Sequence, residues 1–304
     1  MNEAIITRGL VKRYGSVNAL DGFSLSIPSG SITGLVGRNG AGKTTWMMTV
    51  AGFILPDSGE INLLKSGPFD ASRHGDRFAM LPQDSELPHE AKVRALLTHY
   101  ARLQGLTTKA AKKSVDSLIK TFNLNDKANT PIRALSHGMR KRAMVAQCFV
   151  GDPEVVLLDE PLNGLDPVEA ARLRSFIGSQ RGRRTIVVSS HNLEDVERLC
   201  THVALVSKGR LVKMDAISSF THGTERIVYG LSSEPKDLAS LREALPEGSF
   251  EWREKERTLV CSFASNADGI AEVNRRLLPV LLAQTDVVSV EPGQSLEEAF
   301  LSRS

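Results

Sequence analysis

The sequence contains no apolar run long enough to cross a membrane. Its longest plain apolar run covers residues 277–283, whereas a membrane-spanning helix needs about 20 residues. The N-terminal residues also lack the basic start and long apolar core of a secretory signal peptide. Any work that the chain does at a membrane is therefore expected to be done from outside the bilayer.

The chain also has few cysteines and a small net charge. Cys148, Cys200 and Cys261 lie far apart and share no Cys-x-x-Cys spacing, so they are expected to be small buried side chains in a reducing compartment, not disulfides or metal ligands. The net charge is only +3 over 304 residues, which gives no reason to expect nucleic-acid binding. With 41% hydrophobic and 24% charged residues, the chain has an ordinary globular composition and enough length for two domains.

Short apolar runs alternate with helical patterns along the first two thirds of the chain. Strands are expected at residues 32–37, 61–64, 78–81, 155–158, 185–189 and 203–206. Helices are expected at residues 44–51, 91–103 and 110–122, and from Ser136 and Asp166 onwards. Buried strands that alternate with helices predict an α/β fold with a mostly parallel sheet.

The pattern changes after a small polar stretch at residues 218–224, which is interpreted as a linker. Beyond it the sequence predicts strands and helices in the order βαββαβ, typical of a small ferredoxin-like α+β domain: strand 226–231, helix 235–244, strands 250–253 and 258–263, helix 267–278 and strand 287–291. A final helix is expected to begin at Ser295, with Glu298 completing a capping box. The predicted domains are therefore residues 1–219 and 225–304.

A glycine-rich loop carries the most specific motif. Residues 37–44, G-R-N-G-A-G-K-T, match G-x-x-x-x-G-K-[ST] and lie between an apolar strand and a helix. Glycines allow successive backbone N–H groups to point at one anion, and the helix N-terminus adds partial positive charge. Lys43 brings a full charge to the outer phosphates, and the Thr44 hydroxyl can ligate Mg²⁺. The predicted nucleotide-binding residues here are Gly37, Arg38, Asn39, Gly40, Ala41, Gly42, Lys43, Thr44 and Thr45; the alternative is a plain turn before a structural helix.

The apolar strand at residues 155–158 ends in two acids, Asp159 and Glu160. Carboxylates at the end of a buried strand need coordination or hydrogen bonds, because a buried charge without them destabilises the fold. Asp159 is predicted to hold the metal ion, and Glu160 to polarise the attacking water. Taken alone the pair is equally compatible with ordinary strand-end acids, and the phosphate loop favours the catalytic interpretation.

Five further features, together with the two motifs above, give residues 4–215 a resemblance to a known family. Together with the loop and the acids they follow the order typical of the ABC-transporter ATPases, although each alone is more often surface or core. They are Tyr14 before the loop, Gln83 in Leu-Pro-Gln, L-S-H-G-M at residues 135–139, N-G-L-D at residues 163–166, and His191 after Ser190. The chain thus resembles a P-loop NTPase with an ABC-type helical insertion and N-terminal antiparallel strands.

The resemblance implies a role for each of these residues. Tyr14 is expected to stack on adenine, Gln83 to sense Mg²⁺ and the γ-phosphate, and His191 to act as the switch histidine. Ser136 and Gly138, in the signature segment, are expected to bind the γ-phosphate of the nucleotide held by a second ATPase subunit.

The signature segment departs from the family pattern L-S-G-G-Q. His137 replaces a glycine and Met139 replaces the glutamine, which puts the turnover rate in question more than nucleotide binding. Arg140, Lys141 and Arg142 follow on the same predicted helix; they are interpreted either as a solvated basic face or as helpers in holding phosphate or ribose.

The C-terminal ending points to one branch of the family. Residues 295–301, S-L-E-E-A-F-L, resemble the S-L-E-x-x-F-L ending common in bacterial ABC-2 type exporter ATPases for drugs and antibiotics; the other interpretation is an amphipathic helix that packs on its own domain. The resemblance implies an ATPase that uses ATP and Mg²⁺, works as a dimer of ATPase domains, and binds an ABC-2 type membrane permease and no nucleic acid. It also implies a peripheral location on the cytoplasmic face of a bacterial plasma membrane. An importer ATPase, or a soluble ABC ATPase without a membrane partner, remains the alternative.

Overall fold

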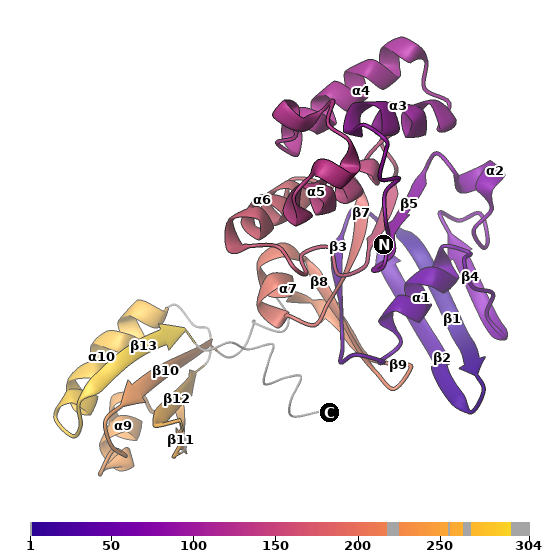
Figure 1. The fold of residues 1–304 in the computed structure, drawn as a ribbon. Helices are drawn as coiled ribbons and strands as arrows, with labels where there is room; N and C mark the ends of the chain where they lie inside the picture. The colour runs from indigo at the N-terminus through magenta and orange to yellow at the C-terminus, as the bar shows by residue number, and fades with distance from the viewer. Residues whose placement is uncertain (1, 218–224, 255, 264–268, 293–304) are drawn as a thin grey trace. The chain divides into compact units, whose positions relative to one another are not determined.

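The chain forms two compact units in the computed structural model, Met1–Asp215 and Ala216–Ser304 (Figure 1). The structure describes residues 2–217, 225–254, 256–263 and 269–292. The predicted linker and the predicted final helix with its exporter-like ending lie outside the described residues. The predicted domain limits, residues 219 and 225, border the same linker and stay predictions.

A six-stranded sheet forms the centre of the first unit. Its strands are β3 (Ile32–Val36), β5 (Phe78–Leu81), β6 (Val155–Leu158), β7 (Thr185–Ser190), β8 (His202–Ser207) and β9 (Arg210–Ala216). They lie in the order β5-β6-β7-β3-β8-β9, and the pairs from β5 through β8 are parallel. Every residue of β3, β6 and β7 is buried, as expected for a parallel sheet covered on both faces. The predicted parallel sheet is confirmed; β9 was not predicted.

Helices follow the strands of this sheet in the α/β pattern. Helices α1 (Lys43–Val50), α6 (Pro167–Gly178) and α7 (Leu193–Leu199) come after β3, β6 and β7. A helical insertion separates β5 from β6 and contains α3 (Val93–Leu103), α4 (Thr108–Thr121), the short 3₁₀ helices η1 (Asn125–Lys127) and η2 (Ile132–Ala134), and α5 (His137–Gln147) (Figure 1). The predicted start of α6 is confirmed in detail, because the Asp166 carboxylate accepts hydrogen bonds from the N–H groups of Val168 and Glu169.

An antiparallel sheet packs beside the phosphate loop and its helix. Strands β1 (Glu3–Tyr14), β2 (Val17–Pro28) and β4 (Ser58–Leu63) pair in the order β2-β1-β4. Trp46 of α1 is fully buried against this sheet: its Nε1 donates to Thr7 Oγ1 at 3.1 Å, and its ring centroid lies 6.1 Å from that of Phe23. These contacts fix α1, and with it the loop at its start.

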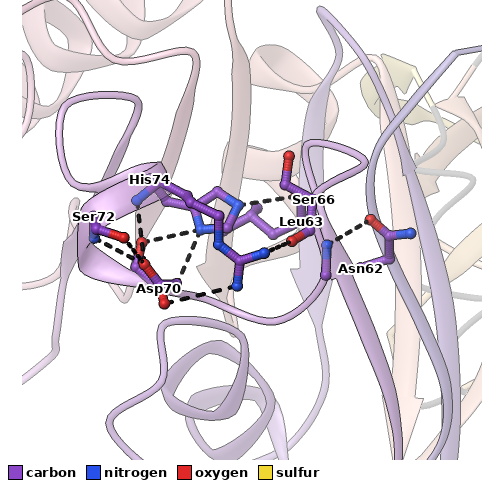
Figure 2. Close-up of polar contacts among 8 residues, drawn as sticks. Asn62, Leu63, Ser66, Asp70, Ser72 and His74 are labelled. Carbon is purple, nitrogen blue, oxygen red and sulfur yellow. Dashed lines mark hydrogen bonds and ion pairs between the residues drawn. The ribbon is translucent and has the colours of Figure 1, made fainter.

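A buried histidine ties the short helix α2 (Ala71–His74) to the end of β4 (Figure 2). The Asp70 N–H lies 3.0 Å from His74 Nδ1, and His74 Nε2 lies 3.2 Å from the Leu63 carbonyl oxygen. The Asp70 carboxylate also caps α2 by accepting a hydrogen bond from the Ser72 N–H. Helix α2 was not predicted, because a single helical turn carries no periodicity.

The second unit has the predicted βαββαβ order. Its elements are β10 (Glu225–Leu231), α9 (Leu238–Ala244), β11 (Ser249–Arg253), β12 (Thr258–Phe263), α10 (Ile270–Leu282) and β13 (Val287–Pro292). The strands form an antiparallel sheet in the order β11-β12-β10-β13. Tyr229 of β10 is fully buried in the core with Leu241 and Leu277 from the two helices.

Helix α10 continues past the end predicted at residue 278. Pro279 lies inside it, and a proline in a helix interior costs about 3 kcal/mol. Val273, Leu277 and Leu281 recur every four residues and are all buried. The buried face therefore continues through Leu281, and the helix ends at Leu282.

The cysteines and the apolar helices can also be compared with the sequence. Cys148, Cys200 and Cys261 are free and buried, as predicted, and burial raises the pKa of Cys148 and Cys261 to about 12. Within the described residues, no helix combines the length and the apolar character that a membrane span requires.

Candidate active site

The phosphate loop is closely packed between two strands. A Cβ at Gly37 would lie 2.4 Å from the Val206 carbonyl oxygen of β8, and one at Gly42 would lie 2.6 Å from the Ala19 carbonyl oxygen of β2. Gly42 also has a φ of 108°, a conformation that side chains disfavour. Glycine is therefore required at both positions, and the loop leads directly into α1.

Lys43 is folded into this loop. Its Nζ donates to the carbonyl oxygens of Gly37 at 2.7 Å and Arg38 at 3.2 Å. Burial lowers the pKa of Lys43, while the nearby carboxylates of Glu160 and Asp159 raise it. The ammonium group therefore lies between the loop and the two acids that follow β6.

Strand β6 carries Asp159 into the interior at the carboxyl end of the sheet. The Asp159 side chain is fully buried, and its Oδ1 accepts a hydrogen bond from the Ser189 hydroxyl of β7. Its other oxygen, Oδ2, is buried and has no hydrogen-bond partner. Such an oxygen is costly unless it meets a cation or a donor.

Glu160 and His191 face one another across the ends of β6 and β7. The two Glu160 carboxylate oxygens lie 3.1 and 3.2 Å from His191 Nδ1. Glu160 has a φ of 47°, which is uncommon outside glycine. Its N–H donates to the Ser189 hydroxyl at 2.8 Å.

A cavity of about 550 Å³ brings these groups together. The predicted residues that line it are Tyr14, Asn39, Gly40, Ala41, Gly42, Lys43, Thr44, Thr45, Gln83, Asp159, Glu160 and His191. Gly37 and Arg38 do not line it; they act through the carbonyl groups that hold Lys43. Ser136 and Gly138, in the signature segment, also lie outside the lining of this cavity.

The signature helix α5 instead packs against the segment at residues 163–166. Ser136 caps α5 by accepting a hydrogen bond from Met139 N–H at 3.2 Å. The His137 ring lies beside Gly164, with its Nε2 3.0 Å from the position that a Cβ there would take. Gly164 has a φ of 76°, so the backbone turns tightly under the imidazole.

The basic residues of α5 do not form a solvated face. Lys141 is 8% exposed and Arg142 is 6% exposed, so that prediction is wrong for both. Arg142 donates to the carbonyl oxygens of Phe122 and Asn123 and pairs with Glu169 of α6 at 2.9 Å. Burial lowers the pKa of Lys141, while the charges of Glu160, Asp159 and Asp84 raise it. Lys141 is thus a second buried lysine that interacts electrostatically with the two acids that follow β6.

Substitution of Arg142 by methionine should destabilise the first unit by about 3 kcal/mol, because it leaves the carbonyl groups of Phe122 and Asn123 without their donor and leaves Glu169 paired only with an exposed arginine. Arg172 pairs with the same Glu169 at 3.1 Å but is 56% exposed on its side chain, so Arg172→Met should cost less than about 1 kcal/mol. Urea unfolding of both variants measures the difference. Equal shifts of the two midpoints would contradict the structural role given to Arg142.

The residues present fit a divalent metal ion beside a nucleotide. The unpartnered Asp159 Oδ2 and the Thr44 hydroxyl on the same cavity are oxygen ligands of the kind that Mg²⁺ prefers. In the described part of the chain, no cluster of three His, Cys, Asp or Glu side chains could hold a metal alone.

Sequence reasoning missed some residues at this site. Val17, Ala19 and Asn163 line the cavity, although only the segment containing Asn163 had been noted. Ser189 holds both acids, and its one signal was a pair of serines at the end of an otherwise apolar strand. Lys141 gave no signal beyond its place in a basic run.

A tight glycine loop, a buried lysine and paired strand-end acids on one cavity define a P-loop nucleoside triphosphatase. The family model described as "ABC transporter" matches residues 20–163. The Nod factor export ATP-binding protein I of Ralstonia nicotianae is 35% identical over 96% of this chain and 91% of its own length. The daunorubicin resistance ATP-binding protein DrrA3 of Streptomyces coeruleorubidus is 32% identical over 98% of this chain and 95% of its own.

Solved structures agree with these relatives. CbiO1 of Clostridium perfringens, described as part of the ABC transporter complex cbiONQ, is 27% identical with a TM-score of 0.63, covering 72% of this chain and 90% of that one. The chain therefore belongs to the ATP-binding subunits of ABC transporters. It binds ATP and is an ATPase, as that family is.

Proposed function

We propose that this chain powers export through a bacterial ABC-2 type permease, working as a pair of ATPase subunits on the cytoplasmic face of the plasma membrane. The supporting observation is similarity over nearly the whole chain, second unit included, to proteins named for Nod factor export and daunorubicin resistance. The solved CbiO1 structure covers only 72% of the chain. The sequence ending S-L-E-E-A-F-L favours the same branch.

The cavity suggests how ATP is held. Tyr14 is 50% exposed at its edge, where it would stack on adenine. The N–H groups of residues 39–45 and the Lys43 ammonium would bind the phosphates. Thr44, Asp159 and Gln83 would hold Mg²⁺, which would neutralise phosphate charge as it is transferred.

Glu160 is the proposed general base. It is 7% exposed, so its carboxylate lies in a poorly hydrated place, where it meets His191 and would meet a positioned water. His191, at 3.1 Å, would hold the carboxylate toward that water and contact the γ-phosphate. A base of this kind contributes about 10²–10⁴ in rate.

The signature segment would complete the site in a second subunit. The helix start at Ser136, with the N–H groups of His137, Gly138 and Met139, offers positive charge to an anion. Because Ser136 and Gly138 lie outside the cavity of their own chain, their proposed target is the γ-phosphate bound by the partner. ATP would then join the two subunits, and hydrolysis would weaken that contact.

The loop after Gln83 is the proposed link to the permease. Gln83 lines the cavity, and four residues later Leu87 is buried at 5% exposure. The segment from Asp84 to Leu87 therefore begins next to the cavity and ends at a buried residue. Loss of the γ-phosphate contact at Gln83 would shift the exposed residues between these two points.

Co-expression with a neighbouring multi-span membrane protein tests this function. The tagged chain should co-purify with that protein in detergent, and ATP hydrolysis by the complex in lipid vesicles should depend on Glu160. Recovery with ribosomes or nucleic acid, without a membrane partner, would support the soluble alternative. Stimulation only by a solute-binding protein would support the importer.

A further inference from the structure

Ser189 occupies a position that the proposed mechanism has not used. It lies near the end of β7 (Thr185–Ser190), next to β6 in the parallel sheet. Its side chain is fully buried. A hydroxyl in such a place must be hydrogen-bonded, because an unpaired buried hydroxyl destabilises the fold.

The hydrogen bonds of Ser189 have a fixed direction. The Glu160 backbone N–H is a donor only, so at 2.8 Å the Ser189 oxygen accepts from it. The Ser189 hydroxyl proton then points to Asp159 Oδ1. An ionised carboxylate oxygen is an acceptor and never a donor. One hydroxyl thus links the side chain of the metal-binding acid to the backbone of the proposed base.

This linkage has consequences for both acids. It occupies Oδ1 of Asp159 and leaves the buried Oδ2 without a partner, so the orientation of the carboxylate toward the cavity is set. It also holds the N–H of Glu160 at a residue whose φ of 47° is unfavourable for a side-chain-bearing residue. The Glu160 side chain leaves the backbone in the direction of His191 because of that conformation.

We propose that Ser189 is a positioning residue for ATP hydrolysis, holding Glu160 in its left-handed conformation and orienting Asp159 with the same hydroxyl. The proposal rests on the function proposed above. It goes beyond the residues that carry the family resemblance, since Ser189 does not itself line the cavity and acts only through Asp159 and Glu160, which do. Loss of the hydroxyl should slow the chemical step while ATP still binds.

Threonine and valine give a matched pair of substitutions at this position. They have nearly the same shape and both suit a strand, but only Ser189→Thr keeps the hydroxyl. We expect Ser189→Val to lower kcat by about tenfold or more, because small misplacements of catalytic groups cost up to about a hundredfold. The KM for ATP should change by less than about threefold, since binding interactions common to both states stay. Ser189→Thr should keep clearly more of the wild-type kcat.

A double-mutant cycle with Glu160→Gln separates positioning from general damage. If Ser189 acts through Glu160, Ser189→Val should reduce the residual kcat of the Glu160→Gln enzyme far less than it reduces that of the wild type. Equal kcat values for the threonine and valine variants, or a fully additive cycle, would overturn the proposal.

Thermal unfolding of each full-length variant accompanies the kinetics. If both matched variants fail to fold, Ser189→Ala decides: a wild-type kcat in a folded alanine variant overturns the proposal, and a reduced kcat with unchanged KM supports it. Failure of the proposed function has a different signature, namely no ATP hydrolysis by the wild type or an unimpaired Glu160→Gln enzyme.

Discussion

Glu160→Gln is expected to lower kcat for ATP hydrolysis by about a thousandfold, within the range of about 10²–10⁴ that a general base contributes. ATP binding should persist, because the residues expected to hold the phosphates lie in the loop and α1, and glutamine preserves the shape of the side chain. The amide has no basic oxygen of comparable strength, so the attacking water keeps its proton. A steady-state phosphate-release assay gives kcat, and equilibrium titration with a fluorescent ATP analogue gives the affinity.

The same variant should accumulate as an ATP-bound dimer. When hydrolysis is blocked, the γ-phosphate stays in place, and the contacts that depend on it persist. Size-exclusion chromatography with light scattering, in the presence of Mg²⁺ and ATP, should show a shift from monomer to dimer mass. Glu154→Gln is the control: Glu154 is paired with Arg77 and half exposed, and it does not line the cavity. A Glu160→Gln enzyme that hydrolyses ATP at the wild-type rate would remove Glu160 from the role of base.

Lys43→Ala is expected to weaken ATP affinity by about tenfold to a hundredfold, since a hydrogen bond to a charged group contributes about 1.5–3 kcal/mol. The ammonium already lies in the loop, 2.7 Å from the Gly37 carbonyl oxygen, so it needs little rearrangement to meet the phosphates. Hydrolysis should fall below detection at ATP concentrations that saturate the wild type. The same fluorescent titration measures the affinity.

Two further variants define what the Lys43 result means. Lys113→Ala removes a lysine from the exposed face of α4 and should leave ATP affinity unchanged. Lys43→Arg keeps the charge but is too large for a site that is 6% exposed, so it should restore binding only in part. An unchanged ATP affinity in a folded Lys43→Ala protein would be incompatible with the phosphate loop assigned here.

Local signals in the sequence were enough to predict where the phosphate loop and the strand-end acids lie in the fold. A tight loop between an apolar strand and a helix needs glycine at Gly37 and Gly42, and in the structure a carbonyl oxygen lies 2.4 or 2.6 Å from the position that a Cβ would take. Likewise Asp159 and Glu160 directly follow a buried strand. Because the strands are parallel, the ends of β3 and β6 lie at the same edge of the sheet, where α1 begins.

Other features depend on contacts that no local pattern records. Arg142 is buried because Phe122, Asn123 and Glu169 come from separate elements to meet it, whereas helical periodicity alone allowed a solvated face. The hydrogen bond from Ser189 to Asp159 joins residues 30 positions apart on neighbouring strands. Helix α10 extends past its predicted end at residue 278. The burial of Leu281 beyond that point is a tertiary contact, which the local sequence pattern does not record. Helix α2 and strand β9 are short or only partly buried, and so carried little periodic signal.

In the proposed dimer each ATP is bound by the loop of one subunit and the signature helix of the other. Mixing two inactive variants tests this arrangement. Lys43→Ala lacks a working loop but keeps its signature segment. Ser136→Asp keeps its loop and a good helix cap, since aspartate caps helices as well as serine, but places a negative charge against the γ-phosphate. Each alone should be inactive.

In an equal mixture half of the dimers are mixed, and each of these has one intact site out of two, so ATPase activity should recover to about a quarter of the wild-type value in a two-fold symmetric dimer. Measured phosphate release from the mixture near that level supports shared sites. No recovery, from variants that fold and from a wild type that is active, would contradict the claim.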